Sequence, residues 1–425
     1  MIKIHGIHLP HRKNTASSET VNLPLPKTVT IPMLMNMGAP CDPVVKVGDE
    51  VKVGQLIGES DKFMSVPVHS SVSGKVTAIS DMRLANGTVC KSITIETDGN
   101  QTVSENIRPP KISTREEFVG ALRESGLTGL GGAGFPVHIK HNPKTPVDTL
   151  IVNAAECEPY ITSDHRQMLE DAEAVIDGVQ LIMKYTGIKN VIIGIEKNKP
   201  DAIKLLTKEL YDCPEINVKT LSSSYPQGAE KVLIYNTTGR IVKEGQLPSD
   251  AGVIVVNVST AAQIAHFMKT GMPLVSRRIT VDGDIVKKPC NIFAPIGTPF
   301  EDILKFAECD TERFTKLIAG GPMMGSCVFD MQSPVVKGTN AILAFEKYAQ
   351  PVMTNCIRCG KCISACPYKL MPTEMEKAYA KKDVEALKKL KVTLCMNCGC
   401  CTYVCPAGRK LAETNQLAKS LIPRN

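Results

Sequence analysis

The chain contains no tryptophan, and only 4% of its 425 residues are aromatic. Surfaces that bind nucleic acids commonly stack bases on aromatic side chains, so this composition argues against a nucleic-acid partner. The chain also lacks a continuous apolar run of membrane-spanning length. Its best stretch, residues 251–268, is interrupted by polar side chains, which are Asn257, Ser259, Gln263 and His266. The N-terminus has no apolar core of the signal-peptide kind, so we expect neither a transmembrane segment nor a secretory signal.

A strong charge of one sign is also missing, because 50 Lys and Arg face 43 Asp and Glu, which gives a net charge of +7. With basic and acidic residues interspersed, this small excess predicts a solvated surface, or a basic face toward an acidic partner or an anionic lipid. The length suffices for two to four domains, and 43% of the residues are hydrophobic, so we expect a multidomain globular protein.

Cysteine, by contrast, is abundant, with 16 in all. The motif C-x2-C-x2-C-x3-C-P occurs twice near the C-terminus, beginning at Cys356 and at Cys395. In bacterial ferredoxins each motif gives three thiolates to one [4Fe-4S] cluster and its fourth cysteine to the other cluster. The predicted ligands of one cluster are therefore Cys356, Cys359, Cys362 and Cys405, and those of the other are Cys395, Cys398, Cys401 and Cys366.

Two other uses of cysteine fit this pattern less well. A zinc site needs four ligands, often as two CxxC pairs, and does not require three evenly spaced cysteines followed by Cys-Pro. Disulfide frameworks belong to small secreted domains. Cys400 lies beside Cys401 but outside the spacing, so we expect it not to be a ligand. The remaining cysteines are scattered, as is typical of a reducing cytosol.

The N-terminal quarter of the sequence predicts β-structure. Residues 1–28 are polar and irregular, and we expect them to form an arm laid over the rest of the chain. Residues 29–106 contain short β-type runs separated by glycine turns, which predict a small β domain. Residues 43–58 and 65–79 resemble the two halves of a lipoyl-type barrel-sandwich domain. Lys62 stands where such domains carry a lipoyl or biotinyl group, and an unmodified lysine in an exposed hairpin is the alternative.

Later residues alternate between apolar runs and helical patterns, which predicts a parallel sheet covered by helices over residues 107–262. We expect strands at residues 149–153, 190–195 and 251–257, and helices at residues 165–185 and 199–211. Residues 272–335 are again β-rich, with a hairpin that turns at Asp282-Gly283. After Thr339 we expect helices around the cysteine motifs, including one helix over residues 373–390.

Four motifs in the α/β region carry residue types that suit a nucleotide ligand. The glycines of residues 130–136, Leu-Gly-Gly-Ala-Gly-Phe-Pro, allow backbone N–H groups to approach a phosphate or a flat ring, although a tight turn would use them equally. Residues 153–159, Asn-Ala-Ala-Glu-Cys-Glu-Pro, follow the first expected strand, at the end where parallel sheets bind ligands. The other two motifs are residues 225–231, Tyr-Pro-Gln-Gly-Ala-Glu-Lys, and residues 257–260, Asn-Val-Ser-Thr.

These motifs resemble those of the FMN- and NADH-binding subunit of respiratory complex I, and more closely those of the RnfC family of the Rnf complex. The paired cysteine motifs, residues 29–106 and residues 5–10 also fit that family, so the resemblance covers essentially the whole chain. It implies a multidomain α/β and β fold. The implied domains are a barrel-sandwich domain at residues 29–106, a Rossmann-like FMN/NADH domain at 107–262, an SLBB β-grasp-like domain at 263–338, and a helical two-cluster ferredoxin domain at 339–425.

The resemblance also assigns residues to a flavin and nicotinamide site. The residues that it implies around the FMN and nicotinamide rings are Gly131, Gly132, Gly134, Phe135, Asn153, Glu156 and Glu158. Lys140 would approach the FMN phosphate, and Asn257 and Thr260 would contact the FMN tail. Tyr225, Gly228 and Glu230 would help to form the dinucleotide groove.

The implied activity belongs to a membrane-bound, ion-pumping ferredoxin:NAD+ oxidoreductase. The cofactors would exchange hydride between NAD(H) and FMN, and single electrons between FMN and two [4Fe-4S] clusters, without a catalytic side chain. The partners would be the other Rnf subunits, with ferredoxin reached through them, at the cytoplasmic face of the membrane. Two alternatives remain: a soluble NADH dehydrogenase of the same family that feeds a dedicated reductase such as proline reductase, and a non-catalytic iron–sulfur adaptor. The direction of electron flow stays open.

Overall fold

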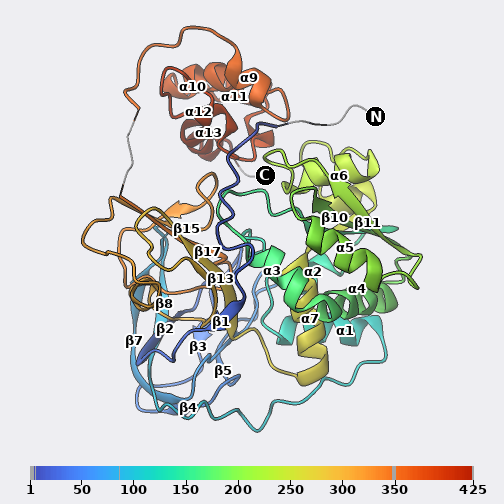
Figure 1. Cartoon of the computed structure of the whole chain (residues 1–425), viewed down its shortest axis with the longest axis vertical. Helices are drawn as coiled ribbons and strands as arrows, with labels where there is room; N and C mark the ends of the chain where they lie inside the picture. Colours follow the sequence, from blue (N-terminus) through green and yellow to red (C-terminus); the bar gives the residue numbers. More distant parts are fainter. Residues whose placement is uncertain (1–3, 5, 86, 347–350, 424–425) are drawn as a thin grey trace.

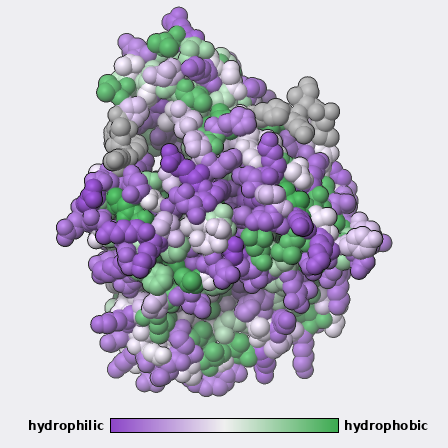
Figure 2. All heavy atoms as spheres, viewed as in Figure 1, coloured by the Kyte–Doolittle hydropathy of each residue, from purple (hydrophilic) through white to green (hydrophobic). Residues whose placement is uncertain are grey.

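A computed structural model describes residues 4, 6–85, 87–346 and 351–423 (Figure 1). The described residues form sheets of six, four, four and three strands, and a C-terminal group of helices lies at one end of the molecule. Polar and apolar side chains are interspersed over the visible face (Figure 2). Within the described part of the chain, no helix has both the length and the apolar character needed to cross a membrane.

Two small antiparallel sheets make up the N-terminal domain. Polar and apolar residues alternate along β2 (Thr28–Pro32), so Val29 and Ile31 are buried and Thr28 and Thr30 are only partly covered. One face of this strand therefore packs into the domain. The first sheet has the order β2, β8 (Val89–Thr97), β7 (Gly74–Arg83) and β4 (Glu50–Val51). The second has the order β3 (Asp42–Pro43), β5 (Leu56–Glu59) and β6 (Val68–His69).

The second domain is built on a parallel four-stranded sheet. Its strands are near-continuous apolar runs, because helices cover both faces. The order is β11 (Ile216–Leu221), β10 (Asn190–Glu196), β9 (Thr149–Ala154) and β12 (Val253–Asn257). The helices are α1 (Arg115–Glu124), α2 (Val137–Lys140), α3 (Ser163–Glu170), α4 (Ala172–Thr186), α5 (Pro200–Glu209), α6 (Glu230–Thr238) and α7 (Val258–Thr270), with a 3-10 turn at Pro248–Ala251.

This domain confirms the predicted parallel sheet and corrects two of its details. The strand β11 was not predicted, because its sequence Ile-Asn-Val-Lys-Thr-Leu places charged and polar residues on an edge strand. The single helix expected at residues 165–185 is two helices, which separate at Asp171.

The strand order places a ligand-binding crevice in a definite position. Strand β9 pairs with β10 on one side and with β12 on the other, so the chain changes its winding direction between β9 and β12. At such a switch point the loops at the carboxyl ends of the strands diverge and leave a crevice. Asn257 ends β12 and is paired in register with Asn153, the next-to-last residue of β9, so both lie at the mouth of the crevice.

Four strands of the six-stranded mixed sheet lie within residues 263–338, where an SLBB domain was expected; the strand at residues 20–22 comes from the N-terminal arm, and the strand at residues 341–345 lies beyond that range. The order of the sheet is β1 (Thr20–Asn22), β14 (Cys290–Pro295), β13 (Ser276–Asp282), β17 (Ala341–Phe345), β15 (Lys316–Ala319) and β16 (Ser326–Cys327), and it is accompanied by α8 (Phe300–Phe306). Because β17 belongs to this sheet, the expectation of helices directly after Thr339 was wrong. The hairpin of β13 and β14 exists, but residues 283–289 connect its strands in place of a two-residue turn.

A buried lysine ties the first three domains together. The Lys337 ammonium donates to the carbonyl oxygens of Pro67 and Gly126, at 2.8 and 2.7 Å, so residues of three domains meet at one nitrogen atom. Burial lowers the pKa of Lys337 to about 7. The N-terminal β domain and the segment that carries Lys337 are therefore both attached to the Rossmann-like domain at Gly126, shortly before its glycine loop.

The C-terminal domain is a group of short helices around the two cysteine motifs. The helices are α9 (Lys361–Ala365), α10 (Pro372–Ala380), α11 (Val384–Lys389), α12 (Cys400–Tyr403) and α13 (Leu411–Ser420), with a 3-10 turn at Val392–Leu394. The single helix expected at residues 373–390 is interrupted between α10 and α11. Lys382 adopts a φ of 52° there, which ends the helix, and Asp383 then caps α11.

Candidate functional site

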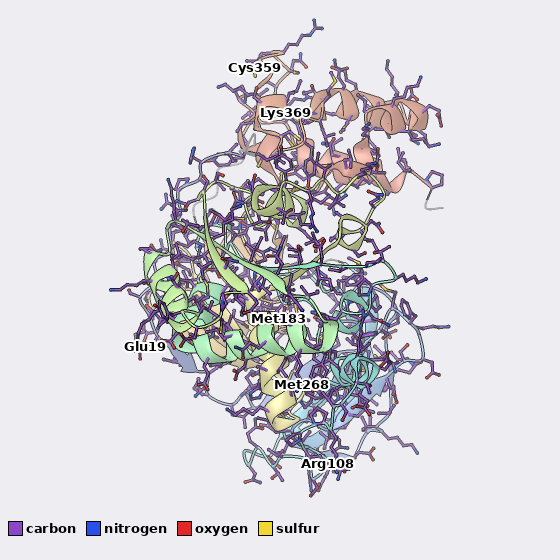
Figure 3. The ribbon with its side chains drawn as sticks, turned by 90° about the vertical axis from the view of Figure 1, so that its right-hand side faces the viewer. Glu19, Arg108, Met183, Met268, Cys359 and Lys369 are labelled. Carbon is purple, nitrogen blue, oxygen red and sulfur yellow. The ribbon has the colours of Figure 1, made fainter. Side chains whose placement is uncertain are left out.

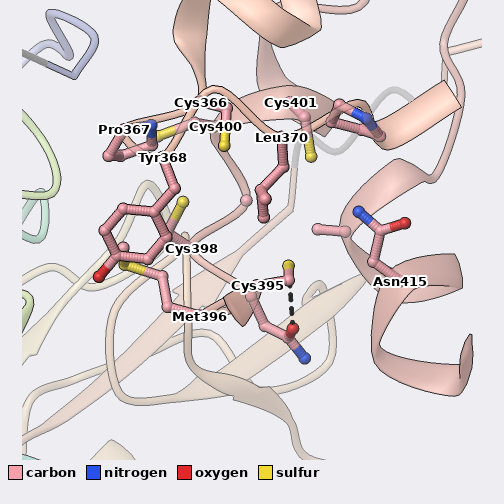
Figure 4. A pocket seen from close by; sticks show the side chains of 14 residues that line it. Cys366, Pro367, Tyr368, Leu370, Cys395, Met396, Cys398, Cys400, Cys401 and Asn415 are labelled. Atoms are coloured by element: carbon pink, nitrogen blue, oxygen red, sulfur yellow. Dashed lines mark hydrogen bonds between the residues drawn. The ribbon is translucent and has the colours of Figure 1, made fainter. Parts of the chain in front are cut away.

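Eight cysteines of the C-terminal domain gather around two separate cavities. One cavity is lined by Cys366 together with Cys395, Cys398 and Cys401 (Figure 4). The other is lined by Cys405 together with Cys356, Cys359 and Cys362. Each cavity therefore takes three cysteines from one motif and the Cys-Pro cysteine from the other motif, which is the crossed arrangement that the spacing predicts.

The equal spacing of the motifs produces equal backbone geometry. Arg358 and Asn397, at corresponding positions, have φ values of 56° and 57°, and Gly360 and Gly399 have φ values of 74° and 78°. A short helix begins directly after each glycine. These left-handed residues bend the chain so that three cysteines of a motif face the same cavity.

The cavities fit cubane clusters better than single metal ions. Within the described residues, no three Cys, His, Asp or Glu side chains lie close enough together to hold one metal ion. A [4Fe-4S] cluster does not require this, because each thiolate binds a different iron at a corner of the cubane. Cys400 also reaches the first cavity, but its Sγ lies 4.0 Å from the carbonyl oxygen of Tyr225, outside the set of four.

The glycine loop lies against the N-terminus of α7, at the switch-point crevice. The Leu130 N–H donates to Thr260 Oγ1 at 2.9 Å, and Gly131 packs against the Asn257 side chain. Gly132 has a φ of 103° with open space where a Cβ would be, whereas Gly134 is buried, with a φ of 64°. The loop thus presents accessible backbone beside the first turn of α7.

A second group of predicted residues closes the same crevice from the side of β9. Asn153 donates from Nδ2 to the carbonyl oxygen of Gly228 at 2.8 Å. A Cβ at Gly228 would lie 2.4 Å from the carbonyl oxygen of Ala155, so only glycine fits this position. The structure therefore brings together five of the predicted residues, which are Gly131, Asn153, Gly228, Asn257 and Thr260.

Lys140 and Glu230 lie at the edge of this region as an ion pair. Their Nζ and Oε1 atoms are 2.9 Å apart, and both side chains are partly exposed. The ammonium expected at an FMN phosphate is thus held by a carboxylate at the start of α6. Phe135 is half-buried, and its carbonyl oxygen accepts from Gly129 N–H, which closes the glycine loop.

Glu156 has an internal partner that the sequence did not reveal. Its carboxylate accepts from the N–H groups of Asp164 and His165, at 2.7 and 3.3 Å, and so caps the first turn of α3. Burial raises the pKa of Glu156. Its place along the flavin ring stays a prediction.

Glu158 binds a loop of the neighbouring sheet domain. It accepts from the N–H groups of Met323 and Met324, at 3.0 and 2.9 Å, and burial raises its pKa to about 7. This loop in turn touches the cluster domain, since a Cβ at Gly399 would lie 3.1 Å from the Met323 carbonyl oxygen. Glu158 therefore supports the junction between domains, and its contact with a flavin or nicotinamide ring stays a prediction.

Tyr225 connects the α/β domain to the cysteine cavity. It is 2% exposed, and its hydroxyl donates to the Cys398 carbonyl oxygen at 2.8 Å. Around it, Leu9 and Met323 pack with Ala365 and Cys400 in one apolar cluster. The cavity that contains Cys398 therefore lies against the α/β domain.

Two further residues at the site carried no motif in the sequence. Lys13, from the N-terminal arm, donates to the carbonyl oxygens of Glu156 and Glu158, both at 2.8 Å, and so fixes the 153–159 segment. Asp164 accepts from Asn257 Nδ2 and from Ser259 Oγ, at 2.7 and 2.6 Å, and so holds the first turn of α7. Neither residue lies in a recognisable sequence pattern, so the sequence offered no signal that would have placed these charges at the crevice.

Tyr225→Phe is expected to slow electron exchange between flavin and clusters without affecting the flavin site. Loss of the hydroxyl leaves the Cys398 carbonyl oxygen unpaired at the domain junction, at a cost of about 1–3 kcal/mol. Stopped-flow absorbance should then show slower cluster bleaching by NADH, with an unchanged rate of flavin bleaching. Tyr211→Phe, at an 88% exposed position, is the matched control. Equal cluster-bleaching rates in Tyr225→Phe and the wild type would exclude this role.

Comparisons with known proteins agree with this division of the chain. Family models match as a Nuo51 FMN-binding domain over residues 122–266, an RnfC barrel sandwich hybrid domain over residues 3–100, and a 4Fe-4S dicluster domain over residues 352–409. The last range includes the eight cysteines that line the two cavities.

Solved structures give the fold alone. NAD+-reducing [NiFe]-hydrogenase superimposes with a TM-score of 0.50 and 19% identity in its H2-reduced state, and with a TM-score of 0.51 and 18% identity in its air-oxidized state. Each match covers 73% of this chain and 63% of the other, so the chain spans less than two thirds of the length of those hydrogenase chains.

Curated relatives are more similar. The C subunit of the Na(+)-translocating ferredoxin:NAD(+) oxidoreductase complex of Acetobacterium woodii is 45% identical, over 84% of this chain and 83% of the relative. Its proton-translocating counterpart from Clostridium ljungdahlii is 42% identical, over 84% and 80%. The C subunit of the ion-translocating oxidoreductase complex of Rhodobacter capsulatus is 36% identical, over 84% and 71%. The chain therefore belongs to the RnfC family of Rnf complex subunits, with an FMN-binding domain and a 4Fe-4S dicluster domain.

Proposed function

We propose that this protein is the NAD(H)-binding electron-transfer subunit of an ion-translocating ferredoxin:NAD+ oxidoreductase. The observation that supports this most strongly is the contact between its two redox modules. The cavity of Cys366, Cys395, Cys398 and Cys401 meets the flavin-type domain through the Tyr225 hydroxyl, within one chain. Electron exchange between bound cofactors requires such proximity.

The chain's own residues bind and orient the cofactors. FMN, when bound, links two-electron hydride exchange with one-electron transfer. The glycine loop at Gly131 offers backbone close to the ring, and the N-terminus of α7 favours a phosphate group. Lys140 can neutralise that phosphate by releasing Glu230, since both side chains are partly exposed. Lys13 and Asp164 hold the two loops that line the crevice.

The eight cysteines would hold the two clusters in the crossed sets that line the two cavities. Other Rnf subunits would be the partners, and ferredoxin would be reached through them. We place the protein at the cytoplasmic face of the membrane, attached through those subunits.

Anaerobic reconstitution with iron, sulfide and FMN tests this function. Addition of NADH is expected to bleach the visible absorbance of the flavin and of the clusters. Cluster bleaching that requires FMN would support the proposed order of cofactors. A protein that retains FMN and both clusters but does not respond to NADH would refute the function. Failure to retain FMN would favour a non-catalytic iron–sulfur adaptor.

A further inference from the structure

The N-terminal arm crosses the junction between the α/β domain and the cluster domain. Near its start, Ile4 N–H donates to Asn236 Oδ1 of α6 at 3.1 Å. At its other end, β1 pairs with β14 of the six-stranded sheet. Glu19, just before β1, lies well away from Cys359 and Lys369 of the cluster domain (Figure 3). The arm therefore runs from α6 to a separate domain, and it is held at both ends.

The backbone of the arm is paired with the backbone of Tyr225. Ile7 N–H donates to the Tyr225 carbonyl oxygen at 2.8 Å, and Tyr225 N–H donates to the Ile7 carbonyl oxygen at 2.9 Å. A Cβ at Gly6 would lie 1.6 Å from the Tyr225 carbonyl oxygen, so only glycine fits this position. The arm thus helps to fix the residue whose hydroxyl binds the Cys398 carbonyl oxygen.

Leu9 adds apolar surface of the arm to the junction. It is 9% exposed and belongs to one apolar cluster with Tyr225 of the α/β domain and with Ala365 and Cys400 of the cluster domain. Ala365 ends α9 in the first cysteine motif, and Cys400 begins α12 in the second. The arm therefore takes part in the packing that joins both motifs to the α/β domain.

Lys13 extends this support to the crevice. Its ammonium donates to three carbonyl oxygens between residues 156 and 161, including that of Glu158 at 2.8 Å. The Glu158 carboxylate accepts from the N–H of Met323, whose carbonyl oxygen lies close to Gly399 of the cluster domain. The contacts of the junction through Tyr225 and through Glu158 are thus both braced by the arm.

We infer that the N-terminal arm positions the cluster domain for electron exchange, with Gly6, Leu9 and Lys13 as its positioning residues. The arm holds the cavity of Cys398 against the α/β domain, and none of the three residues needs to touch a cofactor. This inference rests on the proposed function and assigns the arm a role in it. Electron exchange depends steeply on the separation of the partners, so a small displacement of the cluster domain changes its rate.

The electrons of this exchange balance without a further reactant. One NADH that is oxidised to NAD+ supplies two electrons and releases one proton. Each of the two clusters gains one of these electrons, and the proton passes to the solvent. The reverse direction consumes the same proton. The arm changes only the rate at which the electrons cross the junction.

Truncation of two matched leucines tests the arm. Leu9→Ala removes apolar contacts at the junction, whereas Leu23→Ala removes them from the core of the six-stranded sheet domain, and both leucines are 9% exposed. Cluster bleaching by NADH in the reconstituted protein is expected to be slower by about tenfold or more in Leu9→Ala, and by less than about twofold in Leu23→Ala. Flavin bleaching, FMN affinity and iron content should match the wild type in both. Leu9→Met nearly conserves the side-chain volume and should keep the wild-type rate.

Hydrogen exchange of the loaded protein gives a readout that does not depend on electron transfer. The Tyr225 amide, which donates to the arm, should exchange faster in Leu9→Ala than in the wild type, and at the wild-type rate in Leu23→Ala. Gly6→Ala, which clashes with the Tyr225 carbonyl oxygen, should cause the same increase in exchange and the same slow cluster bleaching.

The two readouts separate the possible failures. Equal cluster bleaching in Leu9→Ala and Leu23→Ala would overturn the inference, and faster exchange at Tyr225 alone would leave the arm a purely structural element. A wild-type flavin that NADH does not bleach would refute the proposed function and not the hold of the arm on the cluster domain, which the exchange rates still measure.

Discussion

Cys366→Ala is expected to remove the cluster of the other motif and leave the cluster of its own motif intact. Cys366 lines one cavity with Cys395, Cys398 and Cys401, whereas its motif partners Cys356, Cys359 and Cys362 line the other cavity. Iron content should therefore fall from about eight to about four atoms per chain. NADH should still bleach the flavin, but electrons should reach the remaining cluster inefficiently, because the emptied cavity is the one whose Cys398 contacts the α/β domain.

Double variants separate the crossed arrangement from an uncrossed one. Cys366→Ala combined with Cys395→Ala should still retain about four irons, because both changes affect the same cluster. Cys366→Ala combined with Cys362→Ala should retain almost none. The opposite pattern, with the Cys366/Cys362 variant retaining four irons, would show that each motif holds its own cluster. Cys400→Ala is the matched control, since this cysteine is buried in the same domain but lies outside the sets of four.

The cysteine cavities were the part of the site that the sequence determined most completely. A three-residue spacing with a left-handed residue and a glycine between the cysteines turns consecutive thiols to one side, and this is a local property of the chain. The crossing of the fourth cysteine needs only the two motifs to pack against each other. Both features depend on short-range geometry, so a sequence pattern can predict them.

The charges at the crevice were less predictable, because long-range packing decides their partners. Glu156 and Glu158 were expected to face the ligand on account of their place after a strand. In the structure, one carboxylate caps α3 and the other binds a loop some 165 residues further along the chain. Lys13 reaches the same segment from the N-terminal arm. No local pattern records contacts over such separations.

The sheet domains illustrate the same limit. The apolar runs of β9, β10 and β12 predicted a parallel sheet, but the polar sequence of the edge strand β11 gave no sign of a fourth strand. Strand β17 was missed because a short apolar run such as Ala341–Phe345 cannot be distinguished from a buried helical segment by its pattern alone. The switch point between β9 and β12, which positions the crevice, therefore followed from the structure and not from the sequence.

The second large effect is expected at the glycine loop. Gly131→Val should raise the FMN dissociation constant by about a hundredfold or more, and should abolish NADH-dependent bleaching at moderate FMN concentrations. Gly131 is exposed, and its φ is not positive, so valine adds no left-handed strain. The nearest neighbour of its Cβ would be Asn257 Cβ at 3.5 Å, an ordinary contact. The folded chain can therefore accept the valine side chain. The valine would occupy the open space beside the loop, where the FMN is expected to bind.

Because valine at position 131 should not strain the fold, a change in FMN affinity can be told apart from a loss of stability. The thermal unfolding of the cofactor-free variant should match that of the wild type, whereas fluorescence titration with FMN should not. Gly120→Val is the matched control, because Gly120 is exposed on α1 with no atom within 4 Å of its added Cβ. FMN affinity that is equal in Gly131→Val and Gly120→Val would place the flavin away from this loop. Since Asn153 and Asn257 frame the same crevice, the switch point would then no longer be the flavin site.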